Sequence, residues 1–138
     1  ILFYMKHYFT MHDGYLQDPN DENHIIPFEQ VYRAKACDGS YCRFYAKNKK
    51  TGMISQSVGR VFDDFDNLLF VRYHENGFVN LKAIKKIWLK REGKSTRLFD
   101  VIGKKKLETS KRKTPGFIRT YNIFRKNVLL RSENPGTA

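Results

Sequence analysis

The chain is a series of short apolar or alternating runs separated by turn-forming residues, a pattern typical of antiparallel strands. Alternation is clearest over 41–47, "YCRFYAK", which places Tyr41 and every second residue after it on one face and Cys42 and its alternates on the other. Asp38–Gly39, just before this run, is a strong hairpin signal. We therefore expect a turn here, after the partly extended segment 25–36.

Further strands are predicted wherever apolar residues recur between turn signals. They cover residues 5–12, 68–73, 96–101 and 106–110. The polar segment 13–23 contains the breakers Gly14 and Pro19, so it is predicted as a loop. Pro27 argues against a regular ladder in the segment that follows, because proline cannot donate a backbone hydrogen bond.

Two segments have the features of short helices. In 57–67, Ser57 is a suitable N-cap and apolar residues follow at i, i+3, i+4 and i+7, which forms a stripe that covers a sheet. In 114–124, Thr114 is the expected N-cap and Pro115 the first helical residue. The apolar residues of a third segment, 82–91, fit either a helix or a strand.

The pattern therefore predicts a mainly β domain with two short helices. The sequence contains no internal repeat and no low-complexity linker. We accordingly expect a single domain over residues 1–131 and a disordered tail over 132–138.

The positive charge of the chain is concentrated in its second half. The net charge is +12; residues 1–81 contain nine Lys/Arg and ten Asp/Glu, whereas residues 82–131 contain seventeen Lys/Arg and three Asp/Glu. This asymmetry predicts one basic face and a polyanionic partner, with nucleic acid ahead of an anionic membrane. Lysines on strand edges also discourage aggregation, which accounts for some of them.

Several other classes of protein are disfavoured. The longest apolar run, "ILFYM", is far too short to cross a membrane. Cys37 and Cys42 are too few for a disulfide scaffold or a four-ligand zinc site, and we interpret them as small apolar strand residues. We expect a cytoplasmic protein with no membrane partner.

Enzymatic chemistry has little support in the sequence. His74, Glu75 and Asn76 are suitable for metal or acid–base chemistry, but no second ligand cluster with suitable spacing accompanies them. The sequence has no zinc-protease, phosphate-loop or nucleophile-elbow motif. We therefore expect no catalysis, no metal and no cofactor.

Two short polar segments stand out as binding candidates. "HENG", residues 74–77, interrupts a run of residues that otherwise has the character of buried strands, so it is either an ordinary turn or one displayed for a purpose. Lys111–Lys113 follow Ser110 directly before the second predicted helix. A basic run on such a turn projects several donors that can reach both phosphates and base edges, although it is also compatible with a solvated charged loop.

These segments resemble a known family. "NLLFVRYHENGFVNLKAIKKI" is similar to the central signature of the LytTR DNA-binding domain, and "KLETSKRK" is similar to that family's late strand and basic turn. The residues that match the signature are Phe70, Arg72, His74, Phe78, Val79, Asn80 and Ile84. "VYRAKACDGSYCRFYAK" is similar to the early hairpin of the family, and the resemblance spans roughly residues 8–124.

The resemblance implies a mainly β fold of about ten short antiparallel strands in stacked sheets, with one or two short helices and no catalytic activity. It implies the output domain of a bacterial response regulator in a two-component system. Such domains bind promoter DNA by inserting loops into successive major grooves. They usually bind as pairs on direct repeats, so a homodimer on DNA is the expected assembly.

The resemblance also assigns DNA contacts to three loops. The first contains Ser40, Tyr41 and Cys42, the second Glu75 and Asn76, and the third Lys111 and Arg112. We expect phosphate contacts from Lys113, from Lys105 and its neighbours in 104–106, and from the lysines of 82–91. Glu75 replaces the Arg or Asn that is common in the family, so its carboxylate must either accept from cytosine N4 or point away from the phosphates.

Two alternatives stay open at this point. The chain is also compatible with an RNA-binding module, in which exposed Tyr41, Tyr45 or Tyr73 stack on unpaired bases beside the basic residues. It is compatible as well with a protein-interaction or sensory domain in which the charge is incidental. Preference for duplex over single strands, and the salt sensitivity of binding, distinguish the three.

Overall fold

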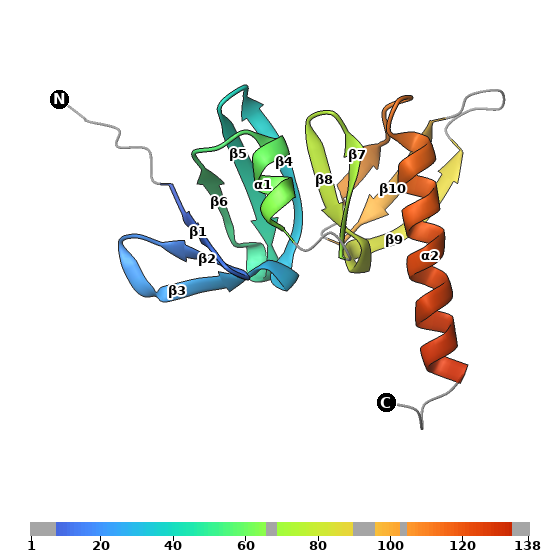
Figure 1. Ribbon diagram of the computed structural model, residues 1–138, viewed down its shortest axis with the longest axis horizontal. Coiled ribbons are helices and arrows are strands. Elements are labelled where there is room, and N and C mark those ends of the chain that lie inside the picture. The colour runs from blue at the N-terminus through green and yellow to red at the C-terminus, as the bar shows by residue number, and fades with distance from the viewer. Residues whose placement is uncertain (1–7, 66–68, 90–95, 103–104, 134–138) are drawn as a thin grey trace.

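The computed structural model describes all residues except 1–7, 66–68, 90–95, 103–104 and 134–138. It confirms the mainly β fold: the described residues form three antiparallel sheets and two α-helices (Figure 1). The strands are β1 (Thr10–His12), β2 (Tyr15–Asp18), β3 (Asp21–Pro27), β4 (Val31–Asp38), β5 (Tyr41–Ala46), β6 (Thr51–Ile54), β7 (Phe70–His74), β8 (Gly77–Asn80), β9 (Ile84–Leu89), β10 (Arg97–Val101) and β11 (Lys105–Glu108). The helices are α1 (Val58–Asp64) and α2 (Thr114–Glu133), and short 3-10 turns lie at Phe28–Gln30, Lys47–Lys49 and Leu81–Ala83.

The central sheet has the strand order β6-β5-β4-β8-β7, and smaller sheets of order β1-β2-β3 and β11-β10-β9 accompany it. The hairpin predicted at Asp38–Gly39 is present between β4 and β5. β5 alternates between half-buried and buried residues along its whole length, as its sequence predicts. The hairpin of β7 and β8 continues the sheet by pairing β8 with β4.

The prediction of a loop over residues 13–23 is wrong, because this segment contributes β2 and part of β3. Each strand has a fully buried residue, Leu16 in β2 and Ile26 in β3, and these two residues pair directly. The other residues of the two strands are mostly polar, which hid the alternation. The ladder extends to Pro27 because β3 is an edge strand, where proline is tolerated. Of the predicted strand 5–12, Thr10–His12 form β1 and residues 1–7 lie outside the described part.

Two hydrophobic clusters form the core, and they meet the central sheet on its two faces. One cluster joins the first six strands, β7 and β8 to α1, and its members include Phe44, Phe70 and Phe78. The other joins β7, β8 and the third sheet to α2, and it includes Val79 and Phe99. Neighbouring residues of β8 belong to different clusters, so all four residues of that strand are buried. This double burial explains the continuous apolar run around "HENG".

The first predicted helix is correct in place and in its cap. The backbone N–H of Arg60 donates to the Ser57 hydroxyl at 3.5 Å, and α1 packs on β4, β5 and β8 through buried Val58 and Val61. The helix ends at Asp64, earlier than the predicted 67. Residues 66 and 67 of the predicted helix lie outside the described residues.

The ambiguous segment 82–91 is a strand, β9, that follows a 3-10 turn. Buried Asn80 directs the chain here: its side-chain oxygen accepts from the Lys82 N–H at 2.9 Å, and its amide donates to the Val31 carbonyl at 3.0 Å. Asn80 thus caps the turn and ties it to the start of β4. Residues 90 and 91 lie outside the described part.

The second helix is longer than predicted. It begins at Thr114, so Lys113 and not Thr114 precedes the first helical residue, and it continues to Glu133. Residues 132 and 133 are therefore helical and not part of a tail, while 134–138 lie outside the described residues. Figure 1 shows α2 beside β7 and the third sheet and then extending past them, and Val128 and Leu129 are exposed.

Candidate nucleic-acid interface

Three turns lie at one end of the molecule, along the upper edge in Figure 1. We call them the first turn (Asp38–Tyr41), the second turn (His74–Gly77) and the third turn (Ser110–Lys113), and this region the turn end. Backbone hydrogen bonds join the second turn to both sides: Ala36 N–H donates to the Asn76 carbonyl at 2.8 Å, and Ser110 N–H donates to the Tyr73 carbonyl at 2.9 Å. Segments more than 30 residues apart in sequence therefore form one surface.

The first turn is shaped by Asp38. The N–H of Ser40 donates to the Asp38 carboxylate at 2.9 Å, and Ser40 itself is exposed. Gly39 is not among the residues with a positive φ, and no atom lies within 4 Å of the Cβ it would carry. The glycine is therefore not required by its backbone geometry, and the hydrogen-bonding aspartate is the residue that makes this turn.

The two other first-loop candidates differ in their accessibility. Tyr41 is half-buried and stacks on Tyr8, with ring centroids 5.3 Å apart and planes 9° apart. Cys42 is fully buried in the first cluster, and burial raises the pKa of its thiol to about 12. The Cys42 side chain therefore faces the core and does not reach the surface of the turn end. We do not include it in the proposed interface.

The backbone of the second turn is held by side chains on both sides of it. The guanidinium of Arg72 donates to the His74 carbonyl at 3.4 Å and to the Glu75 carbonyl at 2.5 Å. The N–H of Asn76 donates to Nδ1 of His74 at 3.2 Å. His74 thus orients the turn, and the Asn76 side chain at its tip is left exposed.

Gly77 completes the second turn for a packing reason. A Cβ at this position would lie 2.5 Å from the Tyr73 hydroxyl oxygen, closer than real Cβ contacts. The Tyr73 ring is buried, packs edge-on against Phe99 at 5.2 Å, and lies close to Arg33. Any larger residue at position 77 would clash with the Tyr73 ring in its present position. "HENG" is therefore a tightly constrained turn that presents Asn76.

Glu75 points toward the third turn. The Ser110 hydroxyl donates to Oε1 of Glu75 at 3.1 Å. The pKa of the carboxyl is lowered chiefly by a hydrogen bond from its own backbone N–H, and further by Ser110, His74 and Lys113. The Glu75 carboxylate is thereby held against the third turn, and its side chain remains 41% exposed.

The third turn rests on a buried pair of threonine hydroxyls, of which the sequence singled out only Thr114, as a helix cap. Thr109 and Thr114 are 1% and 4% exposed, and their Oγ1 atoms are 2.7 Å apart. Thr114 also donates to the Ser110 carbonyl at 2.7 Å, and Arg97 N–H donates to Thr109 Oγ1 at 2.8 Å. These bonds fix both ends of the turn because the pair lies where water cannot replace them.

The tip of the third turn carries exposed cations. Lys111 and Arg112 are exposed and Lys113 is half-buried. A hollow of about 440 Å³ lies beside the turn. It is lined by His74, Thr96, Glu108, Thr109, Ser110 and Lys111. The turn end therefore combines fixed backbones with exposed Asn, Ser, Lys and Arg donors, the groups that proteins use to contact phosphates and base edges.

Other predicted cations lie away from the turn end. Lys105 pairs with Val101 at the far end of β11, and four residues of extended strand, roughly 13 Å, separate it from Thr109. Lys85 and Lys86 are at the beginning of β9. They lie at the same end of the third sheet as Lys105, away from the turn end, because Ile84 also pairs with Val101. Lys104, Lys90, Arg91 and Lys94 lie outside the described residues.

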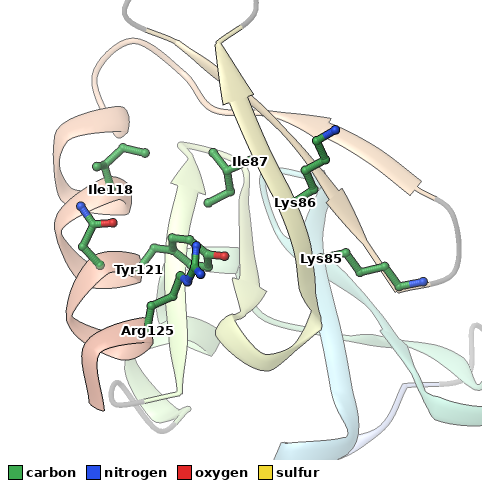
Figure 2. A pocket seen from close by; sticks show the side chains of 7 residues that line it. Lys85, Lys86, Ile87, Ile118, Tyr121 and Arg125 are labelled. Carbon is green, nitrogen blue, oxygen red and sulfur yellow. The ribbon is translucent and has the colours of Figure 1, made fainter. Parts of the chain in front are cut away.

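A groove lies in this part of the molecule, away from the turn end, and we call the region around it the groove end. The groove measures about 260 Å³ and lies between β9 and α2. Its lining residues are Lys85, Lys86, Ile87, Ile118, Tyr121, Asn122 and Arg125. Figure 2 shows Ile118, Tyr121 and Arg125 extending from α2 toward β9, with Ile87 pointing back at them and the two lysine ends pointing away from the helix. The groove end is as rich in cations as the turn end, but it presents side chains from regular elements and not from turns.

The tyrosines of the RNA alternative are not free stacking platforms. Tyr73 is buried at 6% exposure, and the Arg33 guanidinium lies 3.7 Å from the centroid of the Tyr45 ring. Tyr41 has one face against Tyr8. The expectation of an exposed ring is wrong for Tyr73, and Tyr41 and Tyr45 are half-buried with ring contacts of their own, so the structure gives the RNA-binding module little support.

Metal and membrane sites were sought in the described part of the chain. No group of three or more His, Cys, Asp or Glu side chains gathers there in a way that could hold a metal ion. Within the same residues, no helix has the length and apolar character needed to span a membrane.

Comparison with known proteins identifies a family and similar solved structures. The family model described as LytTr DNA-binding domain matches residues 21–121. The fold is similar to that of the LytTr DNA-binding domain of a Bacillus cereus protein described as a methyl-accepting/DNA response regulator, with a TM-score of 0.63 and 23% sequence identity over 70% of this chain and 85% of that one. None of the curated proteins compared with the sequence matches it.

Proposed function

The chain belongs to the LytTr DNA-binding domain family, and we propose that it recognises specific double-stranded sites by inserting the three turns of the turn end into the major groove. The observation that carries this proposal is the position of the three turns on one surface, tied together by the Ala36–Asn76 and Tyr73–Ser110 hydrogen bonds. Donors on fixed backbones lose little conformational freedom on binding, so they can discriminate between base edges.

The exposed hydrogen-bond donors of the turn end each have a suitable role. Arg112 has the planar fork that pairs with guanine O6 and N7, and Asn76 can pair with adenine N6 and N7. Lys111 and Ser40 are suited to phosphates or to single base acceptors. Lys113, the half-buried last residue of the third turn, is the proposed phosphate contact just before α2.

The proposed context is transcription regulation in the bacterial cytoplasm, as the output domain of a response regulator. The similar Bacillus cereus protein carries that description, and DNA binding by the family supports it. We propose that two copies bind direct repeats about one helical turn (~10 bp) apart, because this spacing places both on the same face of the duplex. The proposal includes no catalytic role.

The proposal is tested by selecting binding sites from random double-stranded DNA at about 150 mM salt, where weak non-specific binding is suppressed. We expect enrichment of two short half-sites about one helical turn (~10 bp) apart. Binding that shows no sequence preference and prefers single-stranded RNA to duplex DNA would instead favour the RNA-binding module.

A further inference from the structure

We infer that Glu75 is a positioning residue that couples the second turn to the third, and that it does not read DNA itself. This inference rests on the proposed function, because it concerns how the DNA-contacting residues Lys111 and Arg112 are held. On this inference, the contact between the second turn and the third turn depends on the carboxylate of Glu75.

The first step of the argument is that the backbone of Glu75 is fixed. Its carbonyl accepts from the Arg72 guanidinium, and the next residue is held through Asn76 N–H to His74 and through its carbonyl to Ala36 N–H. With the main chain held on both sides, the side chain has few directions available. It is directed at Ser110, whose Oγ lies 3.1 Å from Oε1.

The second step concerns the single proton of the Ser110 hydroxyl. An ionised carboxylate is only an acceptor, so the hydroxyl must donate its proton to Glu75. The lone pairs of Oγ are then directed elsewhere, and the Lys113 N–H donates to this atom at 3.2 Å. Glu75 thereby orients the hydroxyl that caps the third turn, in a relay that runs from Glu75 through Ser110 to Lys113.

The third step concerns charge. Glu75 is held ionised in the folded chain, since its pKa is lowered, chiefly by its own backbone N–H and also by Ser110, His74 and Lys113. A carboxylate directed at the duplex would repel phosphates. Bonded to Ser110, the carboxylate instead lies against the third turn, and the exposed cations Lys111 and Arg112 remain available for DNA.

The alternative role for Glu75 makes a different prediction. A glutamate that reads DNA accepts from cytosine N4, so its removal relaxes the preference at one base pair. A positioning glutamate acts through the third turn, so its removal relaxes the positions that Arg112 reads. Simple electrostatics predicts a third result, because removing a negative charge from a DNA-binding surface strengthens binding to any sequence.

The experiment is a double-mutant cycle on the selected duplex, measured by fluorescence anisotropy with Glu75→Ala, Ser110→Ala and the double variant. We expect each single change to weaken binding by roughly 3- to 30-fold, and the double variant to bind no more weakly than the worse single one. Glu75→Gln keeps an acceptor oxygen for Ser110, so it should restore most of the affinity. The matched control is Glu22→Ala, which removes an exposed carboxylate from β3 and should not weaken binding.

Three results would overturn the coupling: additive losses, tighter binding by Glu75→Ala, or relaxed preference confined to one base pair that Arg112→Ala does not affect. Amide chemical shifts of the free protein separate this failure from failure of the proposed function. Without any DNA, Glu75→Ala should shift the amides of Lys111–Lys113, and Glu22→Ala should leave them in place. Unchanged amides in Glu75→Ala would reject the relay, whereas a wild-type chain that binds no duplex would reject the proposed function alone.

Discussion

The turn end and the groove end are both basic, but only the turn end has its cations on turns whose backbones are fixed. Lys111 and Arg112 project from a turn held by Thr109, Ser110 and Thr114. Arg125 of the groove end projects from α2, over the Tyr121 ring at 5.9 Å. The difference teaches that net charge identifies the class of partner, whereas the structure of the turns identifies the surface that meets it.

The largest expected difference between the two ends is in the affinity of single arginine variants. Arg112→Ala should weaken binding to the selected site by about 1–3 kcal/mol and relax the preference at one position. Arg125→Ala makes the same change of charge at the groove end and should cost less than about 0.5 kcal/mol, because screening weakens charges beyond ~8–10 Å. Binding isotherms of both variants on cognate and scrambled duplexes measure this. Equal losses would mean that charge alone determines binding.

The next prediction concerns the glycines of the turns. Gly77→Ala places a Cβ against the buried Tyr73 hydroxyl and should lower the free energy of unfolding by about 1–3 kcal/mol. Gly39→Ala meets open space and should change it by less than about 0.5 kcal/mol. Urea denaturation of the two variants provides the comparison. If Gly77→Ala is as stable as the unmodified chain, the proposed packing of the second turn is wrong.

A smaller difference is expected in the salt dependence of two lysine variants. Lys111→Ala should reduce the slope of log affinity against log salt by about 1, since one phosphate contact is lost. Lys105→Ala, at the other end of β11, should leave the slope unchanged. The measurement is a salt titration of each variant on the same duplex. A reduced slope for Lys105→Ala would restore this residue to the interface, where the sequence had placed it.

The last prediction does not involve DNA binding and compares the chemical labelling of the two cysteines on either side of the first turn. Cys37 is exposed, whereas Cys42 is buried with a pKa raised to about 12. A thiol reagent should therefore modify Cys37 readily and Cys42 only after unfolding, because the thiolate is the reactive form. Mass spectrometry of the labelled peptides distinguishes the two. Rapid labelling of Cys42 would place it on the surface of the turn end after all.

Much of the fold was predictable because local signals agreed with tertiary structure. Asp38–Gly39 gave the hairpin, and Ser57 gave the start of α1. The hairpin over 13–23 was missed because a single buried residue per strand is too weak a pattern. The direction of the chain after Asn80 depends on its bonds to distant backbone, which no local pattern contains.

The candidate site was predictable in outline but not in its orientation. The alternation of β5 had already placed Cys42 on the face of Phe44, and this signal argued against its assignment as a contact. Lys105 was expected to contact phosphate together with Lys113 as part of the basic half of the chain, although the length of β11 separates Lys105 from the third turn. The bond from Ser110 to Glu75 links residues 35 positions apart, so only the fold could show it.

The most direct test of the account is a map of amide chemical shifts as the selected duplex is titrated into the labelled protein. The account predicts that the changes are concentrated in the three turns, at Ser40, Asn76 and Lys111–Lys113, with little change at Lys85, Lys105 or Arg125. Changes concentrated around the groove between β9 and α2 would contradict it. The DNA-binding surface would then lie at the groove end.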